Sequence, residues 1–219
     1  MHKTVVIICD GQFPKTEYPR YLIRTADVII CCDGALKKFM KHSEAIFGEE
    51  RLPDLVIGDM DTLPISWQKK YADIIVKESE QEHNDQTKAV RWALSNISGI
   101  ANLYILGSTG GRADHTIGNL SLLMEYTRMF NLGEIMIEAV TDEGTIFAIN
   151  DTTEFDCGTG RSVSIFSPDN TLNIKSTGLE YQTDGVVFDN WWKATLNKAA
   201  QDNVRLELSH PSMVLIILN

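Results

Sequence analysis

The sequence predicts an α/β N-terminal domain with a mostly parallel sheet, followed by an all-β, sandwich-like C-terminal domain. In the N-terminal two thirds, short and nearly continuous apolar runs alternate with segments whose apolar residues recur three and four positions apart. This alternation is typical of strands buried on both faces and covered by helices. Beyond about residue 150, turn-bounded strand-like segments follow one another without a helix. We therefore expect domains at residues 1–145 and 146–219.

The individual elements follow from this pattern in chain order. The strands predicted for the first domain are TVVIICDG (4–11), DVIICCDG (27–34), DLVIGD (54–59), DIIVKE (73–78), NLYILGS (102–108) and EIMIEAV (134–140). The amphipathic helices predicted between them are ALKKFMKH (35–42), SWQKKYA (66–72), DQTKAVRWALSN (85–96) and HTIGNLSLLMEYTRMF (115–130). The strands predicted for the second domain are RSVSIFSP (161–168), LNIKSTGL (172–179), GVVFDN (185–190), NVRLELSH (203–210) and SMVLIIL (212–218).

Composition narrows the classes of protein that fit. A formal net charge of -10 leaves no basic surface for nucleic acid or an anionic membrane, so neither partner is expected. The apolar runs are far shorter than the roughly 20 residues that cross a bilayer. The opening MHKTVVIIC lacks the length and cleavage site of a secretory signal, which indicates a soluble, cytoplasmic protein. The four cysteines show no CxxC spacing and are read as reduced core thiols rather than a metal site.

Acidic residues follow several of the predicted strands. Asp10, Asp33, Asp59 and Asp61 all stand at carboxyl ends, where ligands of open parallel sheets bind. Asp59 and Asp61 are two positions apart and share a face if the chain stays extended, so they could hold one cation. Oxygen ligands of this kind favour Mg²⁺. A single acid in a turn would be unremarkable, but several at one sheet edge predict a site.

A glycine-rich segment, LGSTGGRADHTIGN (106–119), forms a second candidate group. Its glycines let backbone N–H groups approach a ligand closely, and Arg112 offers a planar fork for phosphate oxygens. Asp114 is predicted as the N-cap of the next helix, and His115 and Asn119 share a face near its N-terminus. No Walker P-loop or GxGxxG fingerprint occurs in the chain, so any nucleotide is held by another scheme.

The third group is ESEQEHNDQTKAV (78–90), at the entrance to a predicted helix. Asn84 is the expected N-cap, Asp85 lies in the first turn, and Lys88 follows three residues later on the same face. An acid and a lysine in this arrangement are common in ordinary helices. Gln81, Glu82 and Asp85 nevertheless fall at the same sheet edge as the other acids, which makes a functional reading an equal alternative to the structural one.

Four motifs, in this order and spacing, resemble the thiamine pyrophosphokinase family: CDGA (32–35), GDMDT (58–62), QEHNDQTKA (81–89) and GSTGGRADHTIGN (107–119). GLEY (178–181) and TLN (195–197) are similar to the thiamine-binding β-domain of that family. The resemblance covers nearly the whole chain. It implies an enzyme, a diphosphotransferase that moves the pyrophosphoryl unit of ATP to the hydroxyl of thiamine, giving thiamine diphosphate and AMP. It also implies dependence on Mg²⁺ and a homodimer with active sites near the subunit interface.

The resemblance also implies roles for individual residues. The metal and catalytic carboxylates would be Asp59, Asp61 and Asp85. The ATP-binding residues would be Asp33, Lys88, Gly107, Thr109, Gly110, Gly111, Arg112, Asp114, His115 and Asn119. The residues facing thiamine would be Gln81, Thr195 and Asn197. Asp85 or Asp61 would accept the proton of the thiamine hydroxyl.

The chain departs from the family pattern in places. Glu82 stands where an Asp is common, Asn84 where a Thr is common, and Leu196 where a Ser is expected. Trp191 and Trp192 could supply an aromatic face to the thiazolium cation, and only one of them could face a given side of a strand. An anchor within the β-domain or at a dimer interface is an equal alternative for them.

Other functions fit part of the pattern. A DxD at a strand end also occurs in metal-dependent glycosyltransferases, and a nucleotide-binding module without turnover would need the same acids. A pyrophosphokinase acting on pterins is a third alternative, if the β-domain has diverged. UDP-sugar binding, thiamine-dependent AMP release and a hydroxymethylpterin substrate separate these cases.

Overall fold

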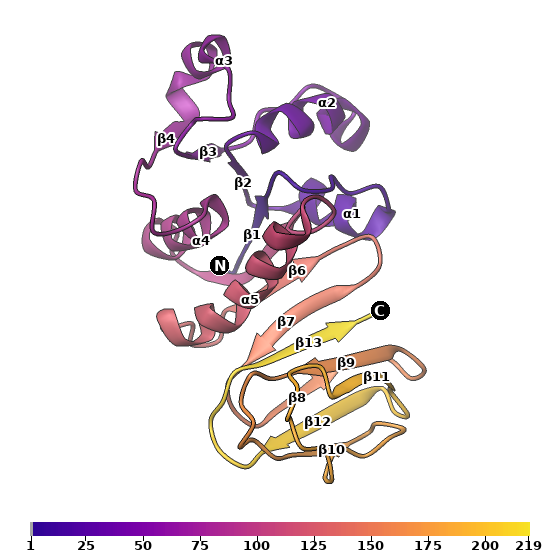
Figure 1. Ribbon diagram of the computed structural model, residues 1–219. Helices are drawn as coiled ribbons and strands as arrows, with labels where there is room; N and C mark the ends of the chain where they lie inside the picture. The colour runs from indigo at the N-terminus through magenta and orange to yellow at the C-terminus, as the bar shows by residue number, and fades with distance from the viewer. Residues whose placement is uncertain (1) are drawn as a thin grey trace. The chain divides into compact units, whose positions relative to one another are not determined.

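The structure of the protein, a computed structural model, describes residues 2–219 (Figure 1). The chain forms two compact units. Unit 1 consists of Met1–Asn119 and Gly133–Asp142, and unit 2 consists of Leu120–Leu132 and Glu143–Asn219. The helix that connects them therefore begins in unit 1 and ends in unit 2.

Unit 1 contains a parallel sheet. Its strands are β1 (Lys3–Ile8), β2 (Val28–Cys32), β3 (Leu55–Gly58), β4 (Ile75–Lys77), β5 (Ile100–Leu106) and β6 (Met136–Val140). They lie in the order β6-β5-β1-β2-β3-β4, and every neighbouring pair is parallel. The chain order reverses between β1 and β5, which is where ligands of such sheets bind. The central strands are buried along most of their length, as their continuous apolar runs predicted.

Helices alternate with the strands of unit 1 along the chain, and the last of them ends in unit 2. They are α1 (Glu17–Thr25), α2 (Ala35–Phe47), α3 (Ile65–Lys70), α4 (Asp85–Asn96) and α5 (Ala113–Met129), with a 3-10 turn, η1, at Ala72–Ile74. Leu22 and Ile23 of α1 and Phe39 of α2 share a core with Val6 and Ile8 of β1. α4 packs against β1, β2 and β3. The α/β prediction for this part of the chain is confirmed.

The sequence reading missed α1. Pro19 lies in its first turn, a position that tolerates proline because the first N–H groups of a helix have no partner within the helix. Only Pro19, Leu22 and Ile23 of this short helix are buried, so its apolar pattern is brief. A proline followed by so few apolar positions gave no periodic signal strong enough to predict a helix.

Unit 2 is an antiparallel β-sandwich. One sheet has the order β7-β13-β9-β11 and the other β10-β12-β8. The strands are β7 (Thr145–Ile149), β8 (Thr153–Asp156), β9 (Ser162–Phe166), β10 (Ile174–Thr177), β11 (Ala194–Lys198), β12 (Asn203–Leu208) and β13 (Val214–Leu218). Val163 and Ile216 from the first sheet and Ile174 and Leu206 from the second share one apolar core. The all-β prediction is confirmed.

The strand predicted at 185–190 is wrong, because this segment is a turn followed by irregular chain. Phe188 is buried in the core, so its apolar residues anchor a loop instead of forming a ladder. Conversely, β7, β8 and β11 were not predicted. β11 is interrupted by a change of register between Ala194 and Asn197, which hides its alternation.

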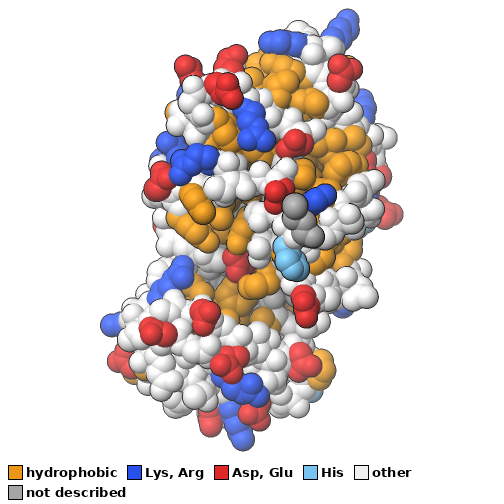
Figure 2. All heavy atoms as spheres, turned by 180° about the vertical axis from the view of Figure 1, so that it is seen from behind, with side chains coloured by type: hydrophobic (Ala, Val, Ile, Leu, Met, Phe, Trp, Pro, Cys, Tyr) orange, Lys and Arg blue, Asp and Glu red, His pale blue; other side chains and the backbone are white. Residues whose placement is uncertain are grey.

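The surface carries charges of both signs. Figure 2 shows acidic and basic side chains interspersed over one face, with apolar patches between them. Within residues 2–219, no helix combines the length and the apolar character that crossing a membrane requires.

Candidate active site

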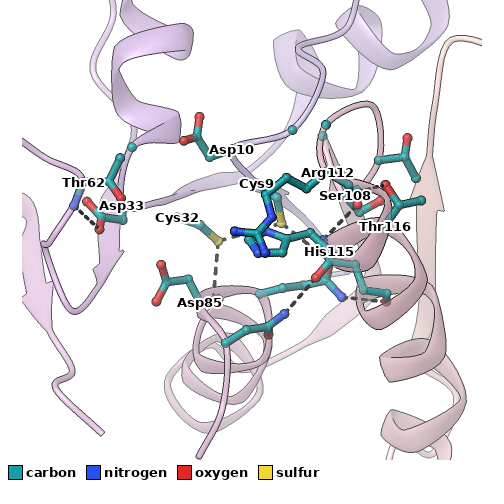
Figure 3. Close-up of a pocket in the computed structure, with 18 residues that line it drawn as sticks. Cys9, Asp10, Cys32, Asp33, Thr62, Asp85, Ser108, Arg112, His115 and Thr116 are labelled. Atoms are coloured by element: carbon teal, nitrogen blue, oxygen red, sulfur yellow. Dashed lines mark hydrogen bonds between the residues drawn. The ribbon is translucent and has the colours of Figure 1, made fainter. Parts of the chain in front are cut away.

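A pocket of about 250 Å³ lies in unit 1 at the point where the strand order reverses (Figure 3). Its walls come from the segments after β1, β2 and β5 and from the first turns of α4 and α5. In Figure 3, Arg112 and His115 reach into it from the β5 and α5 side, and Asp33 and Asp85 lie across from them. The predicted site residues that line it are Asp33, Asp85, Gly107, Thr109, Gly111, Arg112, His115 and Asn119.

Three carboxylates gather beside this pocket. One oxygen from each of Asp33, Asp59 and Asp61 lies within 4.8 Å of the other two. Oδ2 of Asp33 accepts a hydrogen bond from the backbone N–H of Thr62 (3.1 Å), but its buried Oδ1 has no hydrogen-bond partner among the described residues. Burial, with the nearby charges of Asp85, Asp61 and Asp59, raises the pKa of Asp33. A buried carboxylate that keeps one oxygen without a donor and lies beside two further carboxylates fits a divalent cation with oxygen ligands.

The backbone is strained where these acids meet. Asp33 and Met60 have positive φ angles of 34° and 66°, a conformation that costs energy in residues other than glycine. At Gly58 a Cβ atom would lie 3.0 Å from Cβ of Asp33 and 3.1 Å from the carboxyl carbon of Asp85. The glycine of the GDMDT motif therefore lets these two acids approach the end of β3.

Asp85 stands slightly apart from the three carboxylates. Its Oδ1 accepts a hydrogen bond from Nζ of Lys88 at 3.3 Å, and the Lys88 side chain is almost fully buried. Burial, with the charges of Asp59 and Asp61, raises the pKa of Asp85, and Lys88 opposes that rise. Asp85 was predicted as a metal ligand and Asp33 as part of the nearby ATP-binding site; in the structure, Asp33 is the third member of the close group.

The first turn of α4 is built as predicted. Oδ1 of Asn84 accepts a hydrogen bond from the backbone N–H of Thr87 at 3.0 Å, so Asn84 is the N-cap. Glu82, the other departure from the family motif, lies in the exposed loop before this turn, where its N–H donates to Glu80.

The prediction that Asp114 is an N-cap is wrong. α5 begins at Ala113, one residue earlier, because the N–H of Thr116 already donates to the carbonyl of Arg112. Asp114 lies inside the first turn, where it binds Arg112 (Nε to Oδ1, 3.1 Å) and accepts from the N–H of His115. The Arg112 guanidinium holds the pKa of Asp114 below its usual value. Both side chains are exposed.

Asn119 connects two walls of the pocket. Its Nδ2 donates to the carbonyl of Ser108 (2.9 Å) at the end of β5, and its Oδ1 accepts from Nδ2 of Asn84 (2.8 Å) at the start of α4. Its own carbonyl accepts from Nε2 of Gln86 (3.1 Å). With its amide used in this way, Asn119 fixes the position of the pocket walls.

Asp10, expected at this sheet edge, also lines the pocket. The lining residues that were not among those predicted are Cys9, Gly11, Cys32, Gly34, Thr62, Asn84, Gln86, Ser108 and Thr116. Most lie within or beside the four motifs, so proximity to a motif is the sequence signal that could have identified them. Cys9 and Cys32 are buried, with sulfur atoms 4.0 Å apart. Burial raises the pKa of Cys31, the next residue. The reading of the cysteines as reduced core thiols agrees with these positions.

The residues expected to face thiamine lie in both units. In unit 1, Nε2 of Gln81 donates to Oδ2 of Asp59 at 3.2 Å. This hydrogen bond contributes most to lowering the pKa of Asp59. In unit 2, Thr195 and Asn197 line a hollow of about 130 Å³. Asn197 is buried and exchanges two hydrogen bonds with the backbone of Tyr181 (3.1 and 2.7 Å), so it holds the GLEY turn in place.

The two adjacent tryptophans lie in a turn before β11, not in a strand, so the argument from alternating strand faces does not apply to them. Trp191 packs on Phe166 with ring centroids 5.1 Å apart. Both indoles stay about half exposed, and neither lines the hollow around Asn197.

Comparison with protein families decides between the alternatives that the sequence left open. Residues 19–135 match a family described as "Thiamin pyrophosphokinase, catalytic domain", and residues 144–215 match "Thiamin pyrophosphokinase, substrate-binding domain". The chain belongs to the thiamin pyrophosphokinase family. The two matches cover most of unit 1 and most of unit 2 in turn.

Individual relatives agree with this family. Thiamine pyrophosphokinase 1 of Oryza sativa subsp. japonica is 26% identical over 203 residues, which cover 82% of this chain and 73% of that protein. The crystal structure of thiamine pyrophosphokinase from Bacillus subtilis aligns over 99% of both chains with a TM-score of 0.75 and 19% identity. Thiamin pyrophosphokinase from Candida albicans aligns over 99% of this chain and 89% of its own, with a TM-score of 0.78 and 17% identity. The solved structures show that the fold is shared.

These findings favour a thiamin pyrophosphokinase over the other functions considered. A metal-dependent glycosyltransferase and a nucleotide-binding module without turnover find no support in the family matches. The acidic group of this chain is compatible with a divalent metal. Asp33, Asp59 and Asp61 are the residues that could hold it.

Proposed function

We propose that this protein transfers the pyrophosphoryl group of ATP to the hydroxyl of thiamine, releasing AMP and thiamine diphosphate, in a reaction that requires Mg²⁺. Family membership supports the reaction, and the observation that carries the site assignment is the buried carboxylate of Asp33: its Oδ1 has no hydrogen-bond donor among the described residues, and one of its oxygens lies within 4.8 Å of oxygens of Asp59 and Asp61. Such an oxygen is costly to bury unless a cation is bound.

The acidic group would hold the metal. Asp33, Asp59 and Asp61 offer the oxygen ligands that Mg²⁺ prefers, and the nearby Asp85 could add a further ligand. When bound, Mg²⁺ neutralises phosphate oxygens, which is the main requirement of phosphoryl-type transfer. Without it, the carboxylates would repel a triphosphate.

The other walls would hold the nucleotide. Gly107, Thr109 and Gly111 line the pocket in the loop after β5, where small residues leave backbone N–H groups accessible to phosphate. Arg112 would bind phosphate oxygens in exchange for part of its pairing with Asp114, and His115 lies on the same side. Lys88 would act through Asp85, because its ammonium is buried against that carboxylate.

Asp85 is the better placed of the two candidate bases for the thiamine hydroxyl. Its ion pair with Lys88 uses Oδ1, so Oδ2 could accept the proton. Its raised pKa makes it a stronger base than an ordinary aspartate. Asp61 is instead committed to the three-carboxylate group and accepts a hydrogen bond from the hydroxyl of Thr62 (2.7 Å).

Thiamine binding is proposed for residues of both domains. Gln81 would contribute from the ATP-binding domain, predicted at 1–145, and Thr195 and Asn197 from the thiamine-binding domain, predicted at 146–219. The second family match, which is described as a substrate-binding domain, supports this division. The homodimer and the cytoplasmic location stay predictions.

One assay tests the function. Protein, Mg²⁺, ATP and thiamine are mixed, and nucleotides and thiamine esters are separated by chromatography. The proposal expects AMP and thiamine diphosphate in equal amounts, both lost when Mg²⁺ is chelated or thiamine is omitted. Formation of ADP, or AMP release that needs no thiamine, would contradict it. Replacing thiamine with a hydroxymethylpterin should give no AMP.

A further inference from the structure

Lys38, on α2, uses its whole ammonium group on the turn that follows β1. Nζ donates to the carbonyl oxygens of Asp10 (2.6 Å) and Gly11 (2.8 Å), and it forms an ion pair with Oδ1 of Asp10 (2.8 Å). An ammonium has three N–H donors, and each of them has an acceptor here. Lys38 itself does not line the pocket, but Asp10 and Gly11 do.

Lys38 and Lys88 each pair with one of the acids that line the pocket, and a third acid has no lysine partner among the described residues. Asp10, Asp33 and Asp85 all line the pocket. Asp10 is paired with Lys38 (2.8 Å) and Asp85 with Lys88 (3.3 Å), whereas Asp33 belongs to the three-carboxylate group. Two of the three lining acids are therefore neutralised by the chain itself, and the third is left for a cation.

The turn that Lys38 holds also supports the glycine loop. The N–H of Gly11 donates to the carbonyl of Gly107 (2.9 Å), and the N–H of Gln12 donates to the carbonyl of Thr109 (2.7 Å). The contact is close enough that a Cβ at position 11 would lie 2.2 Å from the Thr109 oxygen. A displacement of this turn therefore displaces the loop that would receive the phosphates.

Asp10 is also placed where its charge matters. A Cβ at Gly34 would lie 2.7 Å from Oδ2 of Asp10, so this carboxylate lies against the N-terminus of α2, at the side of the pocket next to Asp33. A helix N-terminus attracts anions, and an unpaired carboxylate there would compete with a phosphate for the same field. The ion pair with Lys38 reduces that competition.

We propose that Lys38 is a positioning residue for the nucleotide: it neutralises Asp10 and holds the turn at residues 10–12 against the glycine loop. The inference rests on the proposed function, because it assumes that this pocket binds the triphosphate of ATP. It assigns Lys38 an effect on ATP binding, through Asp10, and none on the binding of the second substrate.

Replacing Lys38 with methionine removes the charge and keeps the length of the side chain. We expect the KM for ATP and the Kd for Mg²⁺-bound ATP to rise about tenfold, the effect of losing one charge-assisted interaction. kcat and the KM for thiamine should change by less than about threefold, because neither depends on the charge of Asp10. The double variant D10N/K38M should recover the part of the lost affinity that is due to the unpaired charge of Asp10, since a neutral amide needs no counter-charge; the remaining loss measures the hydrogen bonds from Lys38 to the carbonyls of Asp10 and Gly11. Lys41→Met, a substitution of an exposed lysine on the same helix, is the control and should match the parent.

The outcomes separate the possibilities. The inference is overturned if Lys38→Met binds ATP within about twofold of the parent, or if D10N/K38M is no better than Lys38→Met. A lower kcat, higher KM values for both substrates and lower thermal stability, all together, also overturn it, because a purely structural role would act that way. Lys38→Arg keeps the charge and should retain ATP affinity even if the methionine variant folds poorly. A parent protein that binds ATP by calorimetry but makes no AMP would refute the proposed function and still leave the comparison of ATP affinities decisive.

Discussion

Two aspartates, one in each unit, show how different surroundings give the same side chain different roles. Asp169 of unit 2 is surrounded by donors: the N–H and hydroxyl of Thr171, the hydroxyl of Ser212 and the ring of His210, at 2.6 to 3.0 Å. Asp33 of unit 1 has one backbone donor and three carboxylates around it. The hydrogen bonds from Thr171 and then His210 lower the pKa of Asp169, whereas burial raises that of Asp33.

The comparison distinguishes an acid that stabilises the fold from an acid that is available to bind a ligand. Asp169 joins the loop after β9 to the loop between β12 and β13, so its charge is satisfied within the chain. Asp33 adopts a positive φ and leaves one oxygen without a donor, so its charge is destabilising until something else binds it. Natural active sites commonly retain such costs.

The largest effect is expected from Asp61→Asn, which removes one charge from the acidic group with little change of shape. Turnover should fall by a factor of about 100 or more, the size of losses seen when one electrostatic contact to the reacting charge is removed. Thermal unfolding should be close to that of the parent. Steady-state AMP release measures the first quantity and circular dichroism the second.

The control for Asp61→Asn is Asp73→Asn, which changes an exposed acid in η1, in the same unit. It should keep full activity. If Asp61→Asn also keeps near-normal activity, Asp61 has no part in the reaction, and Asp33 and Asp59 alone cannot be called a metal site.

Next in size is Asp169→Asn, which should lower the free energy of unfolding by about 2 kcal/mol, because hydrogen bonds to a charged acceptor are lost. The folded-state pKa of Asp169 lies below its unfolded value, so this stabilisation is complete above about pH 4 and disappears as the pH falls through the folded pKa. Urea unfolding at pH 7 and at pH 3 should show the difference from the parent shrinking in acid.

Asp184→Asn is the matched control for Asp169→Asn, since Asp184 is an exposed acid of the same unit whose carboxylate makes no contact among those described. It should leave stability unchanged at both pH values. A constant difference between Asp169→Asn and the parent across this range would mean that the carboxylate of Asp169 contributes by packing and not by charge.

Asp33→Asn should change the free energy of unfolding in the opposite direction from Asp169→Asn. The folded pKa of Asp33 is raised, so the ionised side chain costs stability at neutral pH, and a neutral amide should raise the free energy of unfolding by about 1 kcal/mol. Oδ1 of asparagine can still accept the hydrogen bond from Thr62. Activity should fall sharply at the same time, and Mg²⁺ should stabilise the parent but not this variant in thermal unfolding. A variant that is both less stable and inactive would contradict the comparison.

Much of the fold was predictable because most of its elements are locally consistent. Continuous apolar runs predicted β1, β2, β3 and β5, and turn-bounded strand-like segments predicted β10 and β12. The misses have different causes. α1 contains a proline and few buried apolar positions, so its local signal is weak, and β11 contains a register shift. In 185–190, packing of apolar residues into the core overrides a strand-like local pattern.

The site was predictable where its residues follow strands and less so where it depends on neighbours. The carboxyl ends of parallel strands meet at one edge, which is why Asp33, Asp59 and Asp61 were expected to lie near one another. The pairing of Asp10 with Lys38 joins residues 28 positions apart, and no spacing rule indicates it. The helix start at Ala113 was also missed, because a carboxylate can serve the first turn from inside the helix as well as from the N-cap position.

The smallest effect is expected from a substitution in unit 2, which tests whether a strained residue there also contributes to function. Leu196 has a φ of 60° and is 88% exposed, so it accepts a left-handed conformation without burying its side chain. Leu196→Asn keeps the register shift of β11 and relieves part of this strain, because asparagine tolerates such angles, and unfolding should become harder by about 0.5 kcal/mol. Thr195 and Asn197 line the hollow on either side of it, so a KM for thiamine that rises while stability improves would show that the leucine side chain itself contacts the substrate. An unchanged KM would mean that the leucine side chain makes no contact with thiamine and that the strained residue only turns the chain.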